Sequence, residues 1–340
     1  MNLTLQILRT IFSSSADHSE LVFSDTDKLE YYRYSVKNRI SLLFLDSLDK
    51  NHQIGTLEPT YEEEKEAYVK TINLIARCSK SLLDANINHA FFKTLRPYRS
   101  TTVDIDILIF GNDTQYMKAS RALQEVGFKF VVRGPRSTTL VDPELHIGID
   151  LYEEIAVSSM IYVNKERLMK LVRIINLPNQ KRIKTLIPEA DLATVIAHSL
   201  IKEQMYPLSE YCTFMYYLDK MNVKNFIDII QQNNLTNAAR THATITSMLY
   251  EALNQKSHAN LRQVLECLGD NSLERRMFLL NDFKTPYKYS LLTVARSFLE
   301  IMKEPKCRTS LTTQILRTLN PNFAKDFLRK LTDHVVRETY

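Results

Sequence analysis

The chain has 340 residues, of which 44% are hydrophobic and 24% charged, so it can build one large core or several smaller ones and is not expected to be disordered. Its four cysteines form no C-x-x-C pair, which argues against a zinc knuckle or a disulfide framework and fits a reducing compartment. No apolar stretch approaches the roughly 20 residues that span a bilayer, and the first residues lack the basic segment of a signal peptide. We therefore expect a soluble, cytoplasmic protein without a membrane partner.

The net charge is +5, and the positive charge is unevenly distributed. One basic stretch covers residues 165–184, where Glu166 is the only acidic residue, and a second covers residues 271–340. Either stretch could contact phosphate groups, and either could be the solvated face of helices. Charge alone therefore does not decide between a nucleic-acid partner and an ordinary surface.

Residues 1–85 have the spacing of amphipathic helices. Apolar residues recur at steps of three and four between Leu29 and Leu43, which predicts one helix there. A further helix is predicted to start at Thr60 and Glu63, which have the spacing of a capping box. We expect these helices to pack against the part of the chain that follows.

Residues 86–163 change to the period of β-strands. Four of the six glycines fall between Gly111 and Gly148, as expected where tight turns connect strands. A helix is predicted in this region, with Asn112 or Asp113 as its N-cap and Gly127 at its C-terminal end. The predicted strands are HAFFK, VDIDILIF, FKFVVR, STTLVD and ELHIGIDLYEE. This order suggests one small mixed sheet with helices on one side.

From about residue 164 the pattern is helical again and has no fixed repeat period. We therefore predict an α+β fold, in which a small mixed β-sheet core is flanked by N-terminal helices and by a larger C-terminal all-helical region. The expected division is an N-terminal helical segment at residues 1–85, an α/β core at 86–163 and a C-terminal helical domain at 164–340.

Three aspartates are the candidate metal ligands. Asp104 and Asp106 lie two residues apart in a predicted strand, so both carboxylates leave the same face. Asp150 lies in the polar phase of another predicted strand, and the three converge if the two strands are neighbours. Three hard oxygen ligands suit Mg²⁺ or Mn²⁺, which would supply the positive charge that adjacent carboxylates need. Glu153 or Glu154 could replace Asp150, but Asp150 lies inside the alternating strand.

These stretches resemble the polymerase-β-like nucleotidyltransferase superfamily, and within it a poorly characterised prokaryotic and archaeal branch. The family pattern is a strand, a glycine-glycine or glycine-serine turn, a spacer, Asp-hydrophobic-Asp, and later a third acidic residue on another strand. In this chain FFKTLRPYRSTTVDIDILIF and HIGIDLY occupy those places, and the resemblance covers about residues 86–205. The family's glycine turn is replaced here by Lys93-Thr94, which leaves less room for the backbone to approach a phosphate.

The resemblance implies a metal-dependent enzyme that transfers a nucleoside monophosphate from an NTP to a hydroxyl, with RNA or a protein side chain as the acceptor. It implies that Asp104 and Asp106 hold two Mg²⁺ or Mn²⁺ ions, and that Asp150 binds the catalytic ion and helps to deprotonate the acceptor. The residues expected to neutralise phosphate charge are Lys93, Thr94, Arg96 and Arg99.

Two other functions fit the same residues. The Lys93-Thr94 departure allows a catalytically degenerate member that binds nucleotide or RNA, for example in a toxin–antitoxin setting. A kinase-like phosphotransferase on the same fold is the third hypothesis. His198 is predicted to be a core or interface histidine, and Arg329 with His334 matches the loose Arg-x4-His pattern of HEPN ribonucleases, a spacing that arises easily by chance.

Overall fold

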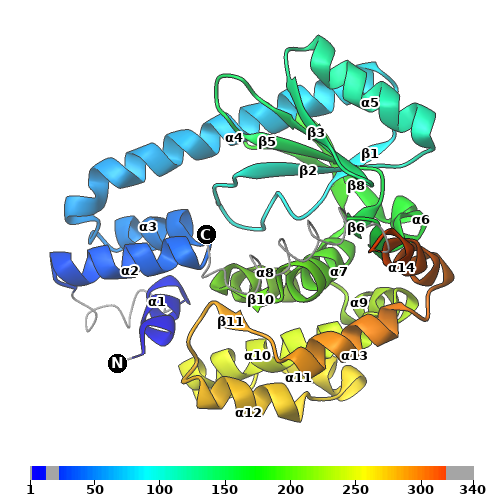
Figure 1. The fold of residues 1–340 in the computed structure, drawn as a ribbon. Coiled ribbons are helices and arrows are strands. Elements are labelled where there is room, and N and C mark those ends of the chain that lie inside the picture. Colours follow the sequence, from blue (N-terminus) through cyan, green and yellow to red (C-terminus); the bar gives the residue numbers. More distant parts are fainter. Residues whose placement is uncertain (1, 13–22, 319–340) are drawn as a thin grey trace.

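The computed structural model describes residues 2–12 and 23–318 and is an α+β fold (Figure 1). Its centre is a seven-stranded mixed sheet with the strand order β3-β4-β5-β2-β1-β9-β8. The pairs β2–β5 and β1–β9 are parallel, and the other neighbours are antiparallel. The strands are β1 (His89–Phe91), β2 (Asp104–Ile109), β3 (Lys129–Arg133), β4 (Ser137–Val141), β5 (Gly148–Tyr152), β8 (Val172–Asn176) and β9 (Arg182–Leu186).

The predicted mixed sheet is confirmed, but the expectation of helix from about residue 164 is wrong for β8 and β9. These strands form a hairpin that pairs with β1 through β9, so the sheet continues past residue 163. Its turn is closed by the amide of Leu177, which donates to the carbonyl of Lys181, and Gln180 has φ +63. A second unexpected hairpin consists of β6 (Ile155–Val157) and β7 (Met160–Val163). The division into domains remains a prediction.

One face of the sheet is covered by α4 (Glu58–Asp84) and α5 (Asp113–Glu125), as Figure 1 shows. Alternate residues of β2, Ile105 and Ile107, are completely buried in a core with Ile75 of α4 and Leu123 of α5. Of the two predicted caps of α5, Asn112 is the N-cap, and its side chain accepts a hydrogen bond from the amide of Gln115.

The opposite face of the sheet is also partly covered, which corrects the expectation of helices on one side only. Ala90 of β1 and Leu108 of β2 belong to a second core together with Leu192 and Ile196 of α7 (Pro188–Ala197). The apolar residues at one end of this face therefore pack against α7, whereas its other end carries the aspartates.

The N-terminal helices are confirmed, but their boundaries differ from the prediction. The single helix predicted over residues 29–43 breaks between α2 (Asp25–Lys37) and α3 (Ser41–Lys50), where Arg39 has φ +59. The helix predicted to start at Thr60 begins earlier, at Glu58, directly after a 3-10 turn, so the capping-box prediction was wrong. The elements before the sheet are α1 (Leu3–Phe12), α2 (Asp25–Lys37), α3 (Ser41–Lys50), η2 (Gly55–Leu57) and α4.

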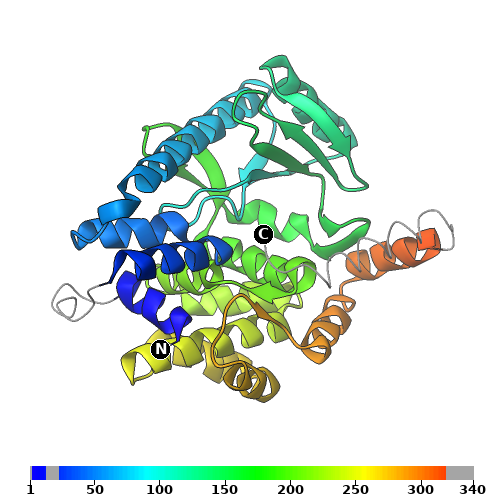
Figure 2. The same ribbon diagram turned by 60° about the vertical axis from the view of Figure 1, so that its left-hand side comes forward.

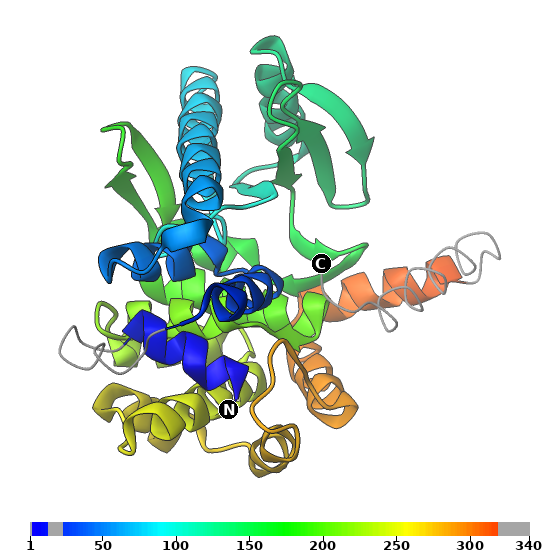
Figure 3. The same ribbon diagram turned by 90° about the vertical axis from the view of Figure 1, so that its left-hand side faces the viewer.

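The C-terminal region is a helical body on the far side of α7 from the sheet, and α14 extends away from it (Figures 2 and 3). The same core joins α1 and α3 of the N-terminal helices to α7, α8 (Leu208–Leu218) and α10 (Thr236–Asn254), so the N-terminal helices pack against the C-terminal helical region. Among the described residues, no helix combines the length and the apolar character of a membrane span. The remaining elements are α6 (Lys165–Leu168), η3 (Met169–Leu171), η4 (His198–Glu203), β10 (Met205–Tyr206), α8 (Leu208–Leu218), α9 (Val223–Gln232), α10 (Thr236–Asn254), α11 (Ala259–Leu268), α12 (Ser272–Leu280), β11 (Tyr287–Lys288), α13 (Leu291–Ile301) and α14 (Pro305–Thr318).

Candidate metal centre

The sheet brings the three predicted aspartates together. Strands β2 and β5 are parallel neighbours, and their register places Asp106 directly beside Asp150 and Asp104 beside Gly148. Each of the three aspartates offers a carboxylate oxygen, and these oxygens lie within 4.8 Å of one another. Because the two strands alternate in phase, the carboxylates lie on the same face of the sheet. The three residues could therefore hold a metal ion.

The surroundings of the triad suit a hard divalent cation. Burial raises the pKa of Asp104 to about 6, and the neighbouring Asp106 carboxylate adds to the shift. Burial also raises the pKa of Asp150, although the hydroxyl of Thr139 donates a hydrogen bond of 2.6 Å to its Oδ1. Oδ1 of Asp106 is buried and has no hydrogen-bond partner among the described residues. A divalent cation bound by the three carboxylates would relieve the repulsion between them.

Lys93 forms an ion pair with the central aspartate of the triad. Its Nζ lies 3.2 Å from Oδ1 of Asp106, as an ion pair rather than an aligned hydrogen bond, and both side chains are more than nine-tenths buried. The rings of Phe92 and Tyr152 lie 4.9 Å and 5.3 Å from the same nitrogen. Burial lowers the pKa of Lys93, and the charge of Asp106 acts against this shift. The ammonium is therefore enclosed by one carboxylate and two aromatic rings.

The Lys93-Thr94 turn has the backbone shape of a glycine turn. Lys93 has φ +59, in the left-handed region that glycine adopts most easily. The hydroxyl of Thr94 accepts a 2.7 Å hydrogen bond from the amide of Asp106, and the amide of Thr94 donates to the carbonyl of Phe92. The polar groups of Thr94 are thus engaged within the turn and fix it to β2.

The structure does not bring Arg96 and Arg99 into the triad. Arg96 donates to the hydroxyl of Thr213 at 3.0 Å and pairs with Glu210 at 3.4 Å, inside the helical body. Arg99 pairs with Asp46 of α3 at 2.5 Å. A phosphate group would have to compete with these carboxylates for either guanidinium.

Three residues beside the site were not predicted to belong to it. Nδ1 of His198 lies 3.3 Å from Nζ of Lys93 and 3.2 Å from the hydroxyl of Tyr162, and its Nε2 lies 3.2 Å from Glu203. Burial and the charge of Lys93 lower the pKa of His198 to about 3, so the ring is neutral and donates through Nε2 to Glu203. His198 is buried as expected of a core histidine, but it also contacts the candidate site.

Local backbone geometry explains why His198 and Glu203 were missed. Both lie in η4, a π-helical turn that follows α7 and widens the helix. A regular helical period predicts a different direction for these side chains. No sequence pattern that we identified marks this turn.

Asp191 of α7 fixes the position of the Lys93 turn through a hydrogen bond. Its Oδ1 accepts a hydrogen bond of 2.8 Å from the amide of Lys93, and its Oδ2 accepts one of 2.8 Å from the hydroxyl of Tyr217. Burial raises the pKa of Asp191. The position of Lys93 therefore depends on helix α7 as well as on the sheet.

The alternative third ligands lie elsewhere. Glu154 is buried and pairs with Lys306 at 2.8 Å, and Glu153 pairs with Arg136 at 3.5 Å. Neither glutamate belongs to the group of carboxylates around Asp106. The pair formed by Arg329 and His334 lies outside the described residues.

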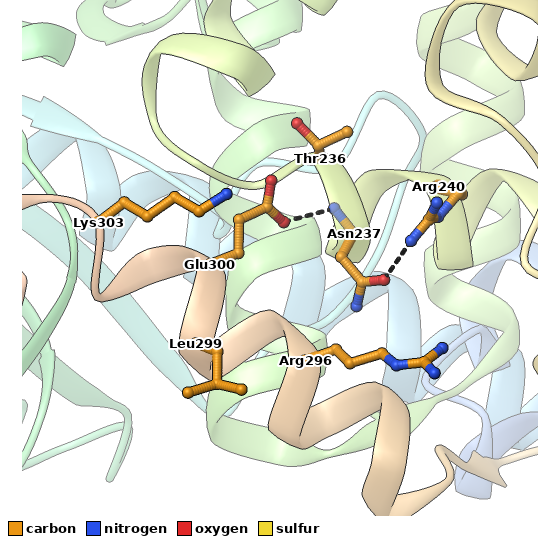
Figure 4. A pocket seen from close by; sticks show the side chains of 7 residues that line it. All are labelled: Thr236, Asn237, Arg240, Arg296, Leu299, Glu300 and Lys303. Atoms are coloured by element: carbon orange, nitrogen blue, oxygen red, sulfur yellow. Dashed lines mark hydrogen bonds between the residues drawn. The ribbon is translucent and has the colours of Figure 1, made fainter.

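A separate hollow of about 350 Å³ lies between α10 and α13 (Figure 4). Three cations line it, but Glu300 already occupies the start of α10, where its Oε2 accepts a hydrogen bond of 2.7 Å from the amide of Asn237. The cations are Arg240, Arg296 and Lys303. None of the three aspartates lines this hollow, so it is a different place from the candidate metal centre.

The described fold and site thus define an α+β protein with a candidate centre for a divalent cation. No protein-family model matches the chain, and no curated protein matches it. Among solved structures, the chain matches a STING-associated CdnE c-di-GMP synthase from Capnocytophaga granulosa with 12% sequence identity and a TM-score of 0.27. The match covers 92% of this chain and 98% of that one. At this TM-score the similarity carries no argument about fold or function.

Proposed function

We propose that this chain is a metal-dependent nucleotidyltransferase that moves a nucleoside monophosphate from an NTP to an acceptor hydroxyl. The observation that carries the proposal is the convergence of Asp104, Asp106 and Asp150 from two parallel strands, with ligand oxygens within 4.8 Å of one another. The resemblance of the Asp-x-Asp strand and its preceding turn to the polymerase-β-like superfamily supports the same reaction class.

In the proposed reaction the acceptor oxygen attacks the α-phosphorus of the NTP. The bond from that phosphorus to the oxygen shared with the β-phosphate breaks, and pyrophosphate leaves. Mg²⁺ or Mn²⁺ held by the three aspartates would polarise the phosphate and acidify the acceptor hydroxyl. Asp150, oriented by Thr139, is the carboxylate proposed to accept the hydroxyl proton. Lys93 supplies a fixed positive charge beside the phosphate.

The proposed acceptor is RNA, with a protein side chain as the other candidate. Arg182 and Lys184 of β9 alternate with residues buried against α4, so they lie on the aspartate face of the sheet, across β1 from β2. Lys165, from the same basic stretch, is instead buried, and its Nζ donates to the carbonyls of Gly111 and Glu153. The register sets Lys184 level with Ala90 and Leu108, at the end of this face that packs against α7, and Arg182 lies further along in the same direction. An RNA strand that contacts these two cations would therefore have to extend along the sheet to reach the aspartates.

The test is to incubate the protein with Mg²⁺, each α-³²P-labelled NTP in turn, total RNA and cell extract. We compare wild type with the double variant Asp104→Asn/Asp106→Asn, which keeps side-chain volume but removes two ligand charges. The matched control is Asp228→Asn, which removes an exposed carboxylate of α9. Label should pass to the acceptor with wild type and the control, and should be lost with the double variant.

Two results would reject the transferase. Equal labelling by the double variant would show that the aspartates are not required, and absence of labelling by wild type with every NTP would remove the activity. A γ-labelled NTP run in parallel separates the kinase-like hypothesis, because only a kinase passes the γ-phosphate to the acceptor.

The second candidate function is a nucleotide- or RNA-binding module without catalysis. The observation that favours it is the buried ion pair between Lys93 and Asp106, because a cation already occupies one side of the triad. Such a protein would bind labelled NTP or RNA and transfer nothing. Retained binding together with absent transfer would therefore support this function over the first.

A further inference from the structure

The positive charge of Lys93 changes the number of metal ions that the triad needs. Three ionised carboxylates carry three negative charges, and the Lys93 ammonium, in contact with Asp106, reduces the sum of the contacting charges to two, whereas Lys202 acts on Asp104 and Asp150 from beyond ion-pair distance. One divalent cation balances this sum. A site for two divalent ions would instead carry two excess positive charges before any phosphate is bound.

The ammonium is held in place rather than free to leave. The Phe92 and Tyr152 rings lie within 5.3 Å of Nζ, and Nδ1 of His198 lies 3.3 Å from it. The backbone at the other end is fixed as well, because the amide of Lys93 donates to Asp191. Both ends of the side chain are thus anchored.

Two-metal sites place their ions roughly 3.5–4 Å apart and need a carboxylate that reaches both of them. Asp106 is the central member of the triad, with Asp104 on its own strand and Asp150 directly across on β5. The Lys93 ammonium lies 3.2 Å from Oδ1 of this central carboxylate. An ion bound to that oxygen from the same side would meet the ammonium.

We propose that the Lys93 ammonium permanently takes one of the two cation positions at Asp106, so that the triad binds a single divalent ion. This inference rests on the proposed function, because it concerns how the same aspartates would act on a triphosphate. In this proposal the Lys93 ammonium is the resident cation of the site, meaning that it occupies the second cation position at Asp106, and the number of bound metal ions falls from two to one.

The test counts Mn²⁺ ions on the full-length protein in the presence of inorganic triphosphate. Free ions are removed by gel filtration, bound Mn²⁺ is quantified, and electron paramagnetic resonance distinguishes isolated ions from spin-coupled pairs. The variants are Lys93→Gly, which suits the left-handed backbone, and Lys93→Met, which keeps the apolar stem between the rings. The control is Lys202→Met, which removes another positive charge whose field reaches Asp104 and Asp150.

Wild type and Lys202→Met should each retain one Mn²⁺ with the spectrum of an isolated ion. Both Lys93 variants should retain two, with the spectrum of a coupled pair. Circular dichroism of each variant checks that it is folded, and either Lys93 variant alone is sufficient for the comparison. The gain from one ion to two is the result that supports Lys93 as the resident cation.

Two coupled ions in wild type, or one ion in the folded Lys93 variants, would overturn the inference. In that case transfer of α-label in the assay above would leave the proposed function standing. If wild type retains no more Mn²⁺ than Asp104→Asn/Asp106→Asn, the metal centre itself is rejected, and the inference is rejected with it. The two failures are therefore distinguishable.

Discussion

His89 is a buried histidine whose protonation should make stability depend on pH. Its side chain is completely buried in β1, its Nδ1 lies 3.0 Å from the carbonyl of Ile87, and its Nε2 has no partner among the described residues. Burial lowers its pKa to about 4. The folded protein therefore keeps this ring neutral at pH values where the unfolded chain protonates it.

The sign of the effect follows from the two pKa values. The unfolded chain binds the proton below about pH 6.5, whereas the folded chain binds it only near pH 4, so stability is lost as pH falls through this window. Between pH 7 and pH 5 this one group should cost about 2 kcal/mol of unfolding free energy. Urea titrations of wild type and His89→Leu at both values test it, and an identical pH dependence in the two proteins would contradict the prediction.

Thr94 offers a prediction about the turn beside the metal centre. Its hydroxyl accepts from the amide of Asp106, so Thr94→Val would leave a buried N–H group without a partner. We expect a loss of about 1–3 kcal/mol in unfolding free energy, because an unsatisfied buried donor carries its full desolvation cost. Thr94→Ser keeps the hydroxyl and should lose less than Thr94→Val. Equal losses in denaturant unfolding would show that the methyl group stabilises the turn as much as the hydroxyl does, which would contradict the prediction.

The three aspartates and Lys93 were predictable from sequence, whereas the contact of Lys93 with the neutral ring of His198 was not. Strand alternation places Asp104, Asp106 and Asp150 in phase, and parallel pairing then brings them together. The contact between Lys93 and His198 joins residues 105 positions apart and depends on a π-helical turn. Periodicity reports which face of an element is buried, but it contains no information on such a long-range contact.

At the scale of the elements, the break between α2 and α3 also depends on long-range contacts that periodicity cannot predict. Apolar spacing continues through residues 29–43, yet the helix stops at Asn38. The side chain of Asn38 accepts from the amide of Leu208 at 3.0 Å and donates to the carbonyl of Thr285 at 3.3 Å. These partners lie far away in the chain, so tertiary hydrogen bonds override a helical pattern that is locally consistent.

Asn38→Ala should therefore destabilise the protein strongly. The substitution leaves the amide of Leu208 and the carbonyl of Thr285 buried without this partner, and we expect a loss of roughly 2–4 kcal/mol in unfolding free energy. Asn51→Ala is the control, because within the described part of the chain the side chain of Asn51 donates to the carbonyl of Ser47, four residues earlier in its own helix region. Its cost should stay below about 1 kcal/mol. Similar losses of unfolding free energy in both variants would argue against a stabilising role for the hydrogen bonds of Asn38 with Leu208 and Thr285.

The strands of the β8–β9 hairpin were not predicted from sequence, because lysines and arginines dominate this stretch. Its lysines and arginines were interpreted as one basic stretch, although Ile175 and Ile183 alternate toward the core that contains α4. The earlier strands were easier to predict because glycines and turn residues separate them. The many charged residues in 165–184 therefore made the alternation of apolar and polar residues in these strands difficult to recognise.

At the scale of the whole molecule, the two cores connect residues from all three of the predicted segments 1–85, 86–163 and 164–340. The core on the α4 face combines residues of α4, α5 and the sheet, including Ile183 of β9. The core on the other face extends from α1 and α3 through α7 to α10. The sheet therefore depends on residues on both sides of the predicted core at 86–163.

The fragment 86–163 should consequently fail to fold by itself. It lacks β9, which pairs with β1, and it lacks the α4 side chains Ile75 and Leu82, which are completely buried against the sheet. Full burial of a large aliphatic side chain is worth about 1.5–3 kcal/mol, so losing several of them removes a free energy comparable to the roughly 5–15 kcal/mol stability of a typical domain. The full chain should show dispersed amide signals in ¹H–¹⁵N spectra, and the fragment should show the narrow dispersion of an unfolded chain. A fragment with dispersed signals and a cooperative urea transition would instead establish residues 86–163 as an independent domain.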